Sequence, residues 1–175
     1  MGARFLLGLL VIIMTLSAIA IGVSAQPAAD IQKHPNCKYC GMDREKFSYS
    51  RMLVVYNDGS EFGACSSHCA AVDIANGFDK IPDLLQVGDY HSKKLIDAEK
   101  ATWVIGGKKP GVMTRRAKWA FEKPEEAAAF VQENEGKLAT FDEAMKATYE
   151  DMYADTKMIR EKRAKRKMMQ EEQKH

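Results

Sequence analysis

Two short cysteine motifs carry the residues best suited to chemistry in this chain of 175 residues. The first, Cys37-Lys-Tyr-Cys40-Gly41-Met42, places two thiols close together and a thioether directly after them. Cysteine pairs with this spacing suit Zn²⁺, Cu(I) or a redox disulfide. Thioether sulfur is a poor ligand for Zn²⁺ but a good one for soft Cu(I), so Met42 favours copper.

The second motif is Cys65-Ser-Ser-His68-Cys69, which lies between a predicted strand and a predicted helix. The spacing puts both thiols on one face of a first helical turn, where the positive end of the helix favours thiolate. His68, between them, is a further candidate ligand. Because a predicted hairpin joins the two motifs, Cys37, Cys40, Cys65 and Cys69 can close one four-sulfur site.

The residues alone leave three interpretations of this site. In an oxidising compartment, four cysteines also suit disulfides, although bridges within each motif would close very small loops and gain little stability. The candidates are a Cu(I) site, a structural Zn²⁺ site with four cysteine ligands, and a redox or disulfide-stabilised interaction module. No nucleophile elbow, phosphate-binding loop or paired-carboxylate motif is present, so no catalytic activity is expected. His34, His91 and His175 lack ligand spacing and are predicted to face solvent.

The elements around the motifs alternate between strand and helix patterns. Apolar and β-branched runs, the Asn57-Asp58-Gly59 turn and the proline and glycine positions predict strands at 51–56, 60–64, 86–91, 101–105, 118–121 and 137–141, and helices at 66–76 and 124–134. This order predicts an α+β fold of two small ββα(β) units in tandem, followed by a long helix over 142–174. Trp103, Trp119 and Phe121 are expected in the core.

The N-terminus has the pattern of a secretory signal. A short positive start, Met1 to Arg4, precedes an apolar run that ends at Val23-Ser24-Ala25, which favours cleavage after Ala25. An uncleaved anchor is the alternative, since the run approaches the roughly 20 residues that cross a bilayer. We therefore expect a signal or anchor at 1–25, a linker at 26–36, a metal-binding domain at 37–145 and a charged helical tail at 146–175. Both alternatives predict export to the periplasm, with membrane contact only through an uncleaved segment.

Charge is balanced overall, with 26 basic and 24 acidic residues. This composition gives no sign of nucleic-acid binding. The last stretch, 157–175, is basic, with eight Lys or Arg residues against three Glu. Its apolar stripe fades after Ile159, so we expect a docked helix whose end extends into solvent. A partner-binding or membrane-surface role for the basic end is the alternative.

With these residues identified, the chain resembles the NosL family of periplasmic copper-binding accessory proteins for nitrous oxide reductase assembly. The resemblance covers 37–145 and is carried by the stretches Tyr39-Cys40-Gly41-Met42, Gly106-Gly107 through Pro110-Gly111-Val112-Met113, and Trp119 through Phe130 to Phe141. It implies two similar ββαβ units and Cu(I) binding by Cys, Met and His side chains. It also implies delivery of copper to a receiving metalloenzyme of the nitrous oxide reductase type.

By position, the resemblance places Cys40 and Met42 on the family's metal-binding motif and Met113 on the methionine of its second half. The chain also departs from the family pattern. It lacks the lipidation cysteine of many members, and Cys37, Cys65 and Cys69 are additional thiols that resemble small cysteine-rich heavy-metal domains. These thiols keep both Cu(I) and Zn²⁺ as candidate ions.

Overall fold

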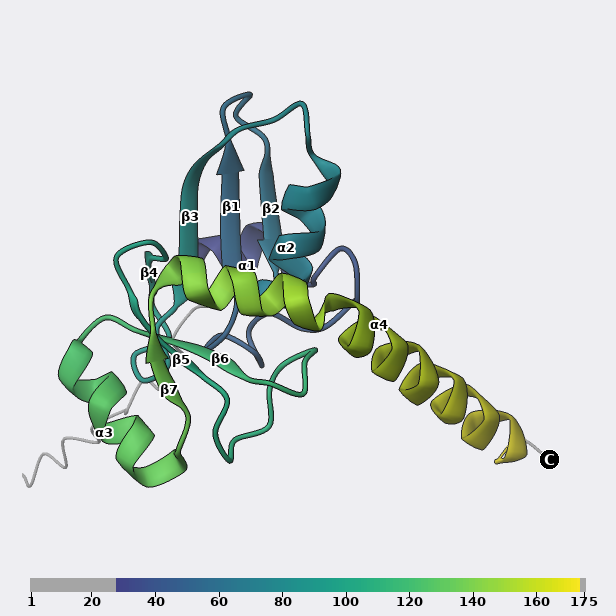
Figure 1. Ribbon diagram of the computed structural model, residues 1–175. Coiled ribbons are helices and arrows are strands. Elements are labelled where there is room, and N and C mark those ends of the chain that lie inside the picture. The colour runs from purple at the N-terminus through teal and green to yellow at the C-terminus, as the bar shows by residue number, and fades with distance from the viewer. Residues whose placement is uncertain (1–27, 174–175) are drawn as a thin grey trace, which may run out of the picture.

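The computed structural model of the protein describes residues 28–173 as two small antiparallel sheets bridged by a long helix (Figure 1). The first sheet has the strand order β2-β1-β3-β4, formed by β1 (Met52–Tyr56), β2 (Glu61–Ala64), β3 (Pro82–Gly88) and β4 (Leu95–Asp97). The second has the order β6-β5-β7, formed by β5 (Thr102–Ile105), β6 (Lys118–Phe121) and β7 (Lys137–Ala139). The predicted α+β class is confirmed.

The first unit is built on the predicted hairpin. Strand β1 lies between β2 and β3, and this central position explains its almost continuous apolar sequence. Met52 pairs with Ala64, so the hairpin brings the start of β1 beside the end of β2. Helix α2 (Ser67–Asn76) follows β2 after only two residues and ends at Gly77 as predicted. The second cysteine motif therefore lies at a junction between strand and helix.

The second unit repeats the ββαβ order. β5 pairs with both β6 and β7, and α3 (Pro124–Asn134) lies between β6 and β7 in the chain. The first turn of a helix does not need the backbone N–H that proline lacks. Glu125 and Glu126, in the same turn, interact favourably with the positive end of the helix dipole. Trp103, Trp119 and Phe121 are buried, as the sequence predicted.

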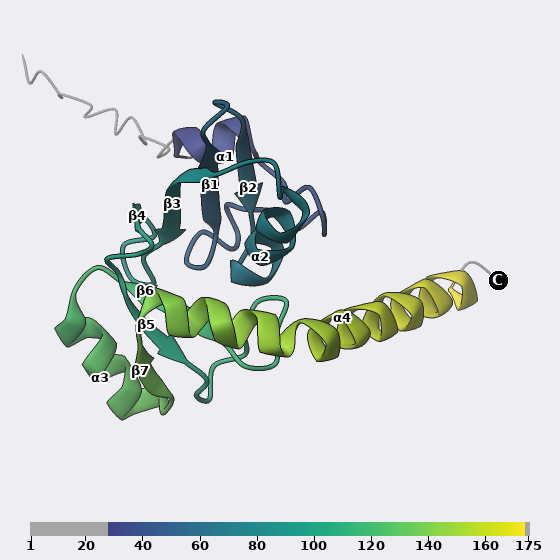
Figure 2. The same ribbon diagram turned by 45° about the horizontal axis from the view of Figure 1, so that its top comes forward.

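Helix α4 (Phe141–Glu172) holds the two units together. It begins with a capping box in which Thr140 and Glu143 each satisfy a backbone N–H of the other. Thr148 Oγ1 donates to Ser67 Oγ of α2 at 3.3 Å, and Asp151 accepts hydrogen bonds from Arg116 and Lys118 of the second unit. The end of α4 extends away from the body of the protein (Figure 2). Within 28–173, no helix has both the length and the apolar character to cross a membrane.

Some sequence expectations differ from the structure. The predicted linker at 26–36 contains a short helix, α1 (Ala29–Lys33), which buries Ile31. Five residues are too few for a helical periodicity to show in the sequence. The strand predicted at 86–91 begins at Pro82 and ends at Gly88, and β4 was not predicted. The predicted signal segment at 1–25 lies outside the described residues.

A buried ion cluster fixes α1 against the first sheet. The Asp30 carboxylate accepts hydrogen bonds from Arg44 and Arg51, whose guanidinium groups are almost fully buried. Arg44 also donates to the carbonyl oxygens of Asp30, His34, Met52 and Ala64. One arginine thus joins α1, both strands of the hairpin and the loop that follows the first cysteine motif.

Replacing Asp30 with asparagine is expected to remove part of the acid sensitivity of folding. Burial raises the pKa of Asp30, but the hydrogen bonds and charges of Arg51 and Arg44 together lower it by more. The pKa of Asp30 therefore lies below its ordinary value. The ionised group stabilises the fold above its unfolded pKa of about 3.9, and this stabilisation is lost as the pH falls from there through the folded pKa. Urea unfolding should show a smaller loss of stability between about pH 5 and pH 2 in Asp30→Asn. An unchanged acid dependence would contradict the prediction.

Candidate metal centre

The four cysteines converge on one point in the first unit. All four are free thiols, and their Sγ atoms lie within 4.8 Å of one another. Cys65 Sγ is 3.3 Å from Cys40 Sγ and 3.8 Å from Cys69 Sγ. Cys37, Cys65 and Cys69 are buried, whereas Cys40 is partly exposed. The structure therefore brings together the four-sulfur group predicted from the spacing, with one thiol that reaches the surface.

The first motif folds into a tight loop that turns its two thiols to the same side. The Gly41 N–H donates to the Cys37 carbonyl at 2.7 Å, and the Cys37 N–H donates to the Met42 carbonyl at 2.9 Å. Gly41 has a φ of +73°, in the left-handed region that glycine adopts without steric strain. A side chain at this position would strain the turn on which the Cys37 and Cys40 geometry depends.

The second motif is positioned by the ends of two elements. Cys65 directly follows β2, and Cys69 lies in the first turn of α2. The Ser50 hydroxyl donates to the Cys65 carbonyl at 2.9 Å, and Arg44 Nε donates to the Ala64 carbonyl at 3.1 Å. These buried hydrogen bonds hold the backbone beneath the thiols, so the cluster is preorganised by the fold.

Because the four thiols lie close together, their pKa values shift in opposite directions. Hydrogen bonds from the neighbouring thiols, chiefly Cys40, lower the pKa of Cys37. The same interactions, together with burial, raise the pKa of Cys65 and Cys69, so the expectation that the start of α2 favours their thiolates is wrong. The group therefore does not carry four negative charges by itself, because like charges at this distance oppose one another. A cation at the centre would remove that penalty, and its binding would release protons.

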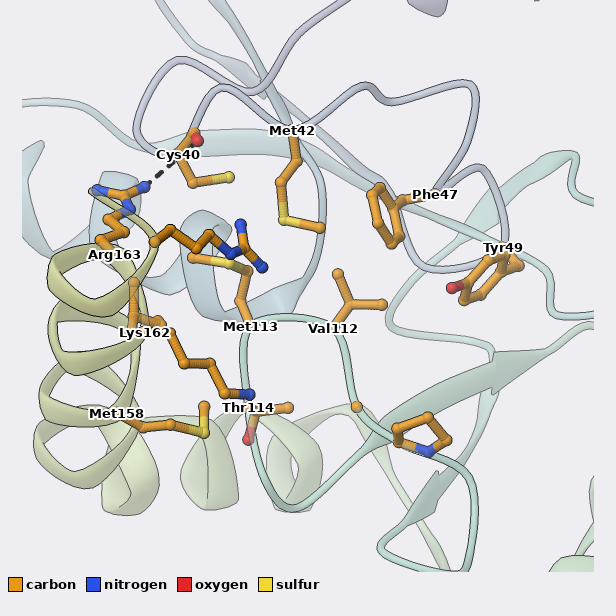
Figure 3. A pocket seen from close by; sticks show the side chains of 14 residues that line it. Cys40, Met42, Phe47, Tyr49, Val112, Met113, Thr114, Met158, Lys162 and Arg163 are labelled. Atoms are coloured by element: carbon orange, nitrogen blue, oxygen red, sulfur yellow. Dashed lines mark hydrogen bonds between the residues drawn. The ribbon is translucent and has the colours of Figure 1, made fainter. Parts of the chain in front are cut away.

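A pocket of about 370 Å³ lies beside the partly exposed thiol. Met42 from the first motif and Met113 from the second unit line it together with Cys40 (Figure 3). In Figure 3 the sulfur atoms of these three side chains point into the same part of the pocket. The predicted ligands Met42 and Met113 thus lie next to Cys40, although they come from different units of the fold.

Met113 is held in place by its own loop and by α4. It has a φ of +60°, which is uncommon for a residue with a side chain and is maintained only where the surroundings fix it. Two residues later, the Arg115 N–H donates to the buried Asp155 carboxylate of α4 at 3.0 Å. Arg116 follows with hydrogen bonds to Asp151 and Glu150. The helix therefore determines where the thioether lies.

His68 is not part of the four-sulfur group. Its side chain is buried, and Nδ1 lies 4.0 Å from Asp155 Oδ2. Among the described residues, this nitrogen has no hydrogen-bond partner. Burial lowers the pKa of His68 despite the nearby carboxylate. The histidine thus packs between α2 and α4. Of the other histidines, His91 is exposed as expected, whereas His34 is half-buried beside Glu61.

Several residues at the site were not predicted from sequence. Lys162, Arg163 and Arg166 of α4 line the pocket, and Arg163 Nη2 donates to the Cys40 carbonyl at 3.3 Å. The basic composition of this stretch was visible, but its place beside the thiol depends on how α4 docks. The Asp30–Arg44–Arg51 cluster was also missed, because no short-range pattern links these residues.

The comparisons with known proteins agree with this arrangement. The sequence profile of the NosL family matches residues 27–149. The crystal structure of the copper chaperone NosL from Shewanella denitrificans superposes with a TM-score of 0.52 at 21% identity, covering 67% of this chain and 94% of that one. That likeness supports the fold. No curated protein matches the chain by sequence. The family match spans well over half of the sequence, and the chain belongs to the NosL family.

Proposed function

We propose that this protein is a Cu(I) metallochaperone of the bacterial periplasm. It binds a cuprous ion through sulfur and delivers it to a copper-receiving metalloenzyme of the nitrous oxide reductase type. The supporting observation is the position of Cys40, which belongs to the four-thiol group and also lines the methionine-containing pocket. Family membership and the copper-chaperone neighbour support a binding protein rather than an enzyme.

The donor set explains the preference for Cu(I). Thiolates and thioethers are soft, polarisable ligands that suit Cu(I) better than hard cations. Cys40 is the partly exposed thiol, so a partner's ligand can reach an ion there while the other thiols remain buried. Stepwise exchange of ligands at Cys40 would transfer the ion without releasing it to water. The apolar N-terminal run supports export, where reduced sulfur must be protected until metal binds.

An anaerobic titration with Cu(I) tests this function. The reduced chain should compete with bicinchoninate for Cu(I), and the double variant Met42→Leu/Met113→Leu should take up less Cu(I) per chain because it lacks the thioethers. Leucine keeps similar volume, so folding should be retained. Met168→Leu, which removes an exposed methionine far along α4, is the matched control. If the reduced chain captures no Cu(I), the proposal is wrong.

A structural Zn²⁺ site is the second candidate, favoured by the geometry of the thiols. Four ligands about 2.3 Å from a tetrahedral Zn²⁺ lie about 3.8 Å apart. The 3.8 Å between Cys65 Sγ and Cys69 Sγ matches this spacing, whereas the 3.3 Å between Cys40 Sγ and Cys65 Sγ is shorter. Metal analysis of protein purified without added metal distinguishes the candidates. One tightly held Zn²⁺ per chain, with no exchange for Cu(I), would favour the structural site.

A further inference from the structure

Cys40 is shared by two adjoining groups of sulfur atoms. In one group its Sγ lies 3.3 Å from Cys65 Sγ, within the four-thiol cluster. In the other it lines the pocket with Met42 and Met113. Figure 3 shows Met158 lower in the view, on the α4 side of the pocket, whereas Met42 and Met113 are drawn next to Cys40. The second group is therefore one thiol and two thioethers.

Each group has enough donors for an ion of its own. The four thiols can complete a tetrahedral shell around one metal, and three of them are 2% exposed or less. Once that shell is complete, the thioethers of Met42 and Met113 are left without a role in it. One thiolate and two thioethers suit Cu(I), which accepts low coordination numbers and soft ligands. A thiolate sulfur also has enough lone pairs to bridge two cuprous ions.

We propose that the protein holds two cuprous ions at adjoining sites that share Cys40 as a bridging ligand. One ion is retained by the four thiolates, and the other lies between Cys40, Met42 and Met113 at the pocket surface. This proposal rests on the Cu(I)-binding function above and adds a second site to it. Each Cys–S–H bond that is replaced by a Cys–S–Cu bond releases one proton, and copper stays in the cuprous state throughout.

Positively charged side chains near the pocket would stabilise the cluster when it holds two cuprous ions. Two cuprous ions neutralise two of the four thiolates and leave the remaining negative charge on the shared cluster. Lys162, Arg163 and Arg166 line the pocket on the α4 side, where their positive charge offsets that excess. Arg163 is already in contact with the backbone of Cys40. The cations thus lie where a doubly loaded cluster needs them.

Two sites that share Cys40 predict a specific pattern of Cu(I) binding among the variants. Native mass spectrometry of the full chain during anaerobic Cu(I) titration should show two bound ions in the unchanged protein. Met42→Leu/Met113→Leu should bind one ion with unchanged high affinity. Cys40→Ser should raise both dissociation constants by at least about tenfold, since it removes a ligand from each site. Met168→Leu is the control and should still bind two.

Other outcomes would overturn the proposal without touching the chaperone function. If the unchanged protein binds only one Cu(I), the two groups serve a single ion. If Cys40→Ser weakens only one of two ions, the sites are independent. Capture of no Cu(I) at all would instead overturn the function itself. Circular dichroism of each variant establishes that a lost ion reflects a lost ligand, and Cys37→Ser provides a second thiol variant that should weaken the retained ion alone.

Discussion

Replacing Cys65 with serine is expected to lower the affinity for the tightly held Cu(I) by at least about 100-fold, since even second-shell partners of metal ligands contribute 10- to 100-fold. Cys65 is fully buried, and its Sγ lies 3.3 Å from Cys40 Sγ and 3.8 Å from Cys69 Sγ. Serine has nearly the same shape but offers a hard oxygen that Cu(I) binds poorly. The fold should survive, and the loss should be one of metal binding.

Competition with a chromogenic Cu(I) chelator measures this effect. Ser50→Ala serves as the matched control, because it removes the hydrogen bond to the Cys65 carbonyl and leaves every sulfur in place. That control should weaken binding far less than Cys65→Ser. Equal affinities of Cys65→Ser and the unchanged protein would show that the buried thiols do not hold the ion.

Replacing Arg44 with alanine should lower the free energy of unfolding by about 3–5 kcal/mol, the usual effect of removing one partner from a buried ion pair. Arg44 is fully buried, and its side chain satisfies the Asp30 carboxylate and four backbone carbonyls. Its loss leaves these acceptors without a donor in a region that excludes water. Because Arg44 contacts the ends of both hairpin strands, the thiol cluster should also lose its fixed geometry.

Urea unfolding monitored by tryptophan fluorescence tests this expectation. Arg160→Ala, on the exposed side of α4, is the control and should change stability by less than about 0.5 kcal/mol. A similar small change for Arg44→Ala would mean that the buried cluster contributes no net stability. Cu(I) binding by the variant should weaken in parallel with its stability.

Local patterns determined how much of the fold was predictable. Strand β6 and helix α3 have the predicted bounds, because a proline and two glutamates mark the start of α3 and an apolar run forms the strand. Helix α1 was missed because its role comes from Asp30, which contacts Arg44 and Arg51 at sequence separations of 14 and 21 residues. Such pairing leaves no periodic trace in the sequence.

Part of the metal site could likewise be predicted from the sequence, and part of it could not. The spacing within the two cysteine motifs was enough to predict that four thiols meet, because a hairpin joins them directly. His68 was a candidate on spacing alone, yet its position on α2 turns it towards Asp155. The cations of α4 could not be placed beside Cys40, because the path of a long helix across two units depends on packing between distant segments.

The path of α4 has a consequence for how the two halves of the site stay in register. One ββαβ unit provides the thiols and the other provides a methionine loop, so the pocket between them belongs to neither unit alone. The helix supplies the spacer, since it contacts Ser67 on one side and Arg115 on the other. The two units also meet directly, since the Tyr90 N–H donates to the Ala120 carbonyl at 2.8 Å. A chain that ended before α4 would therefore keep this junction but lose the brace beside the thioether pocket.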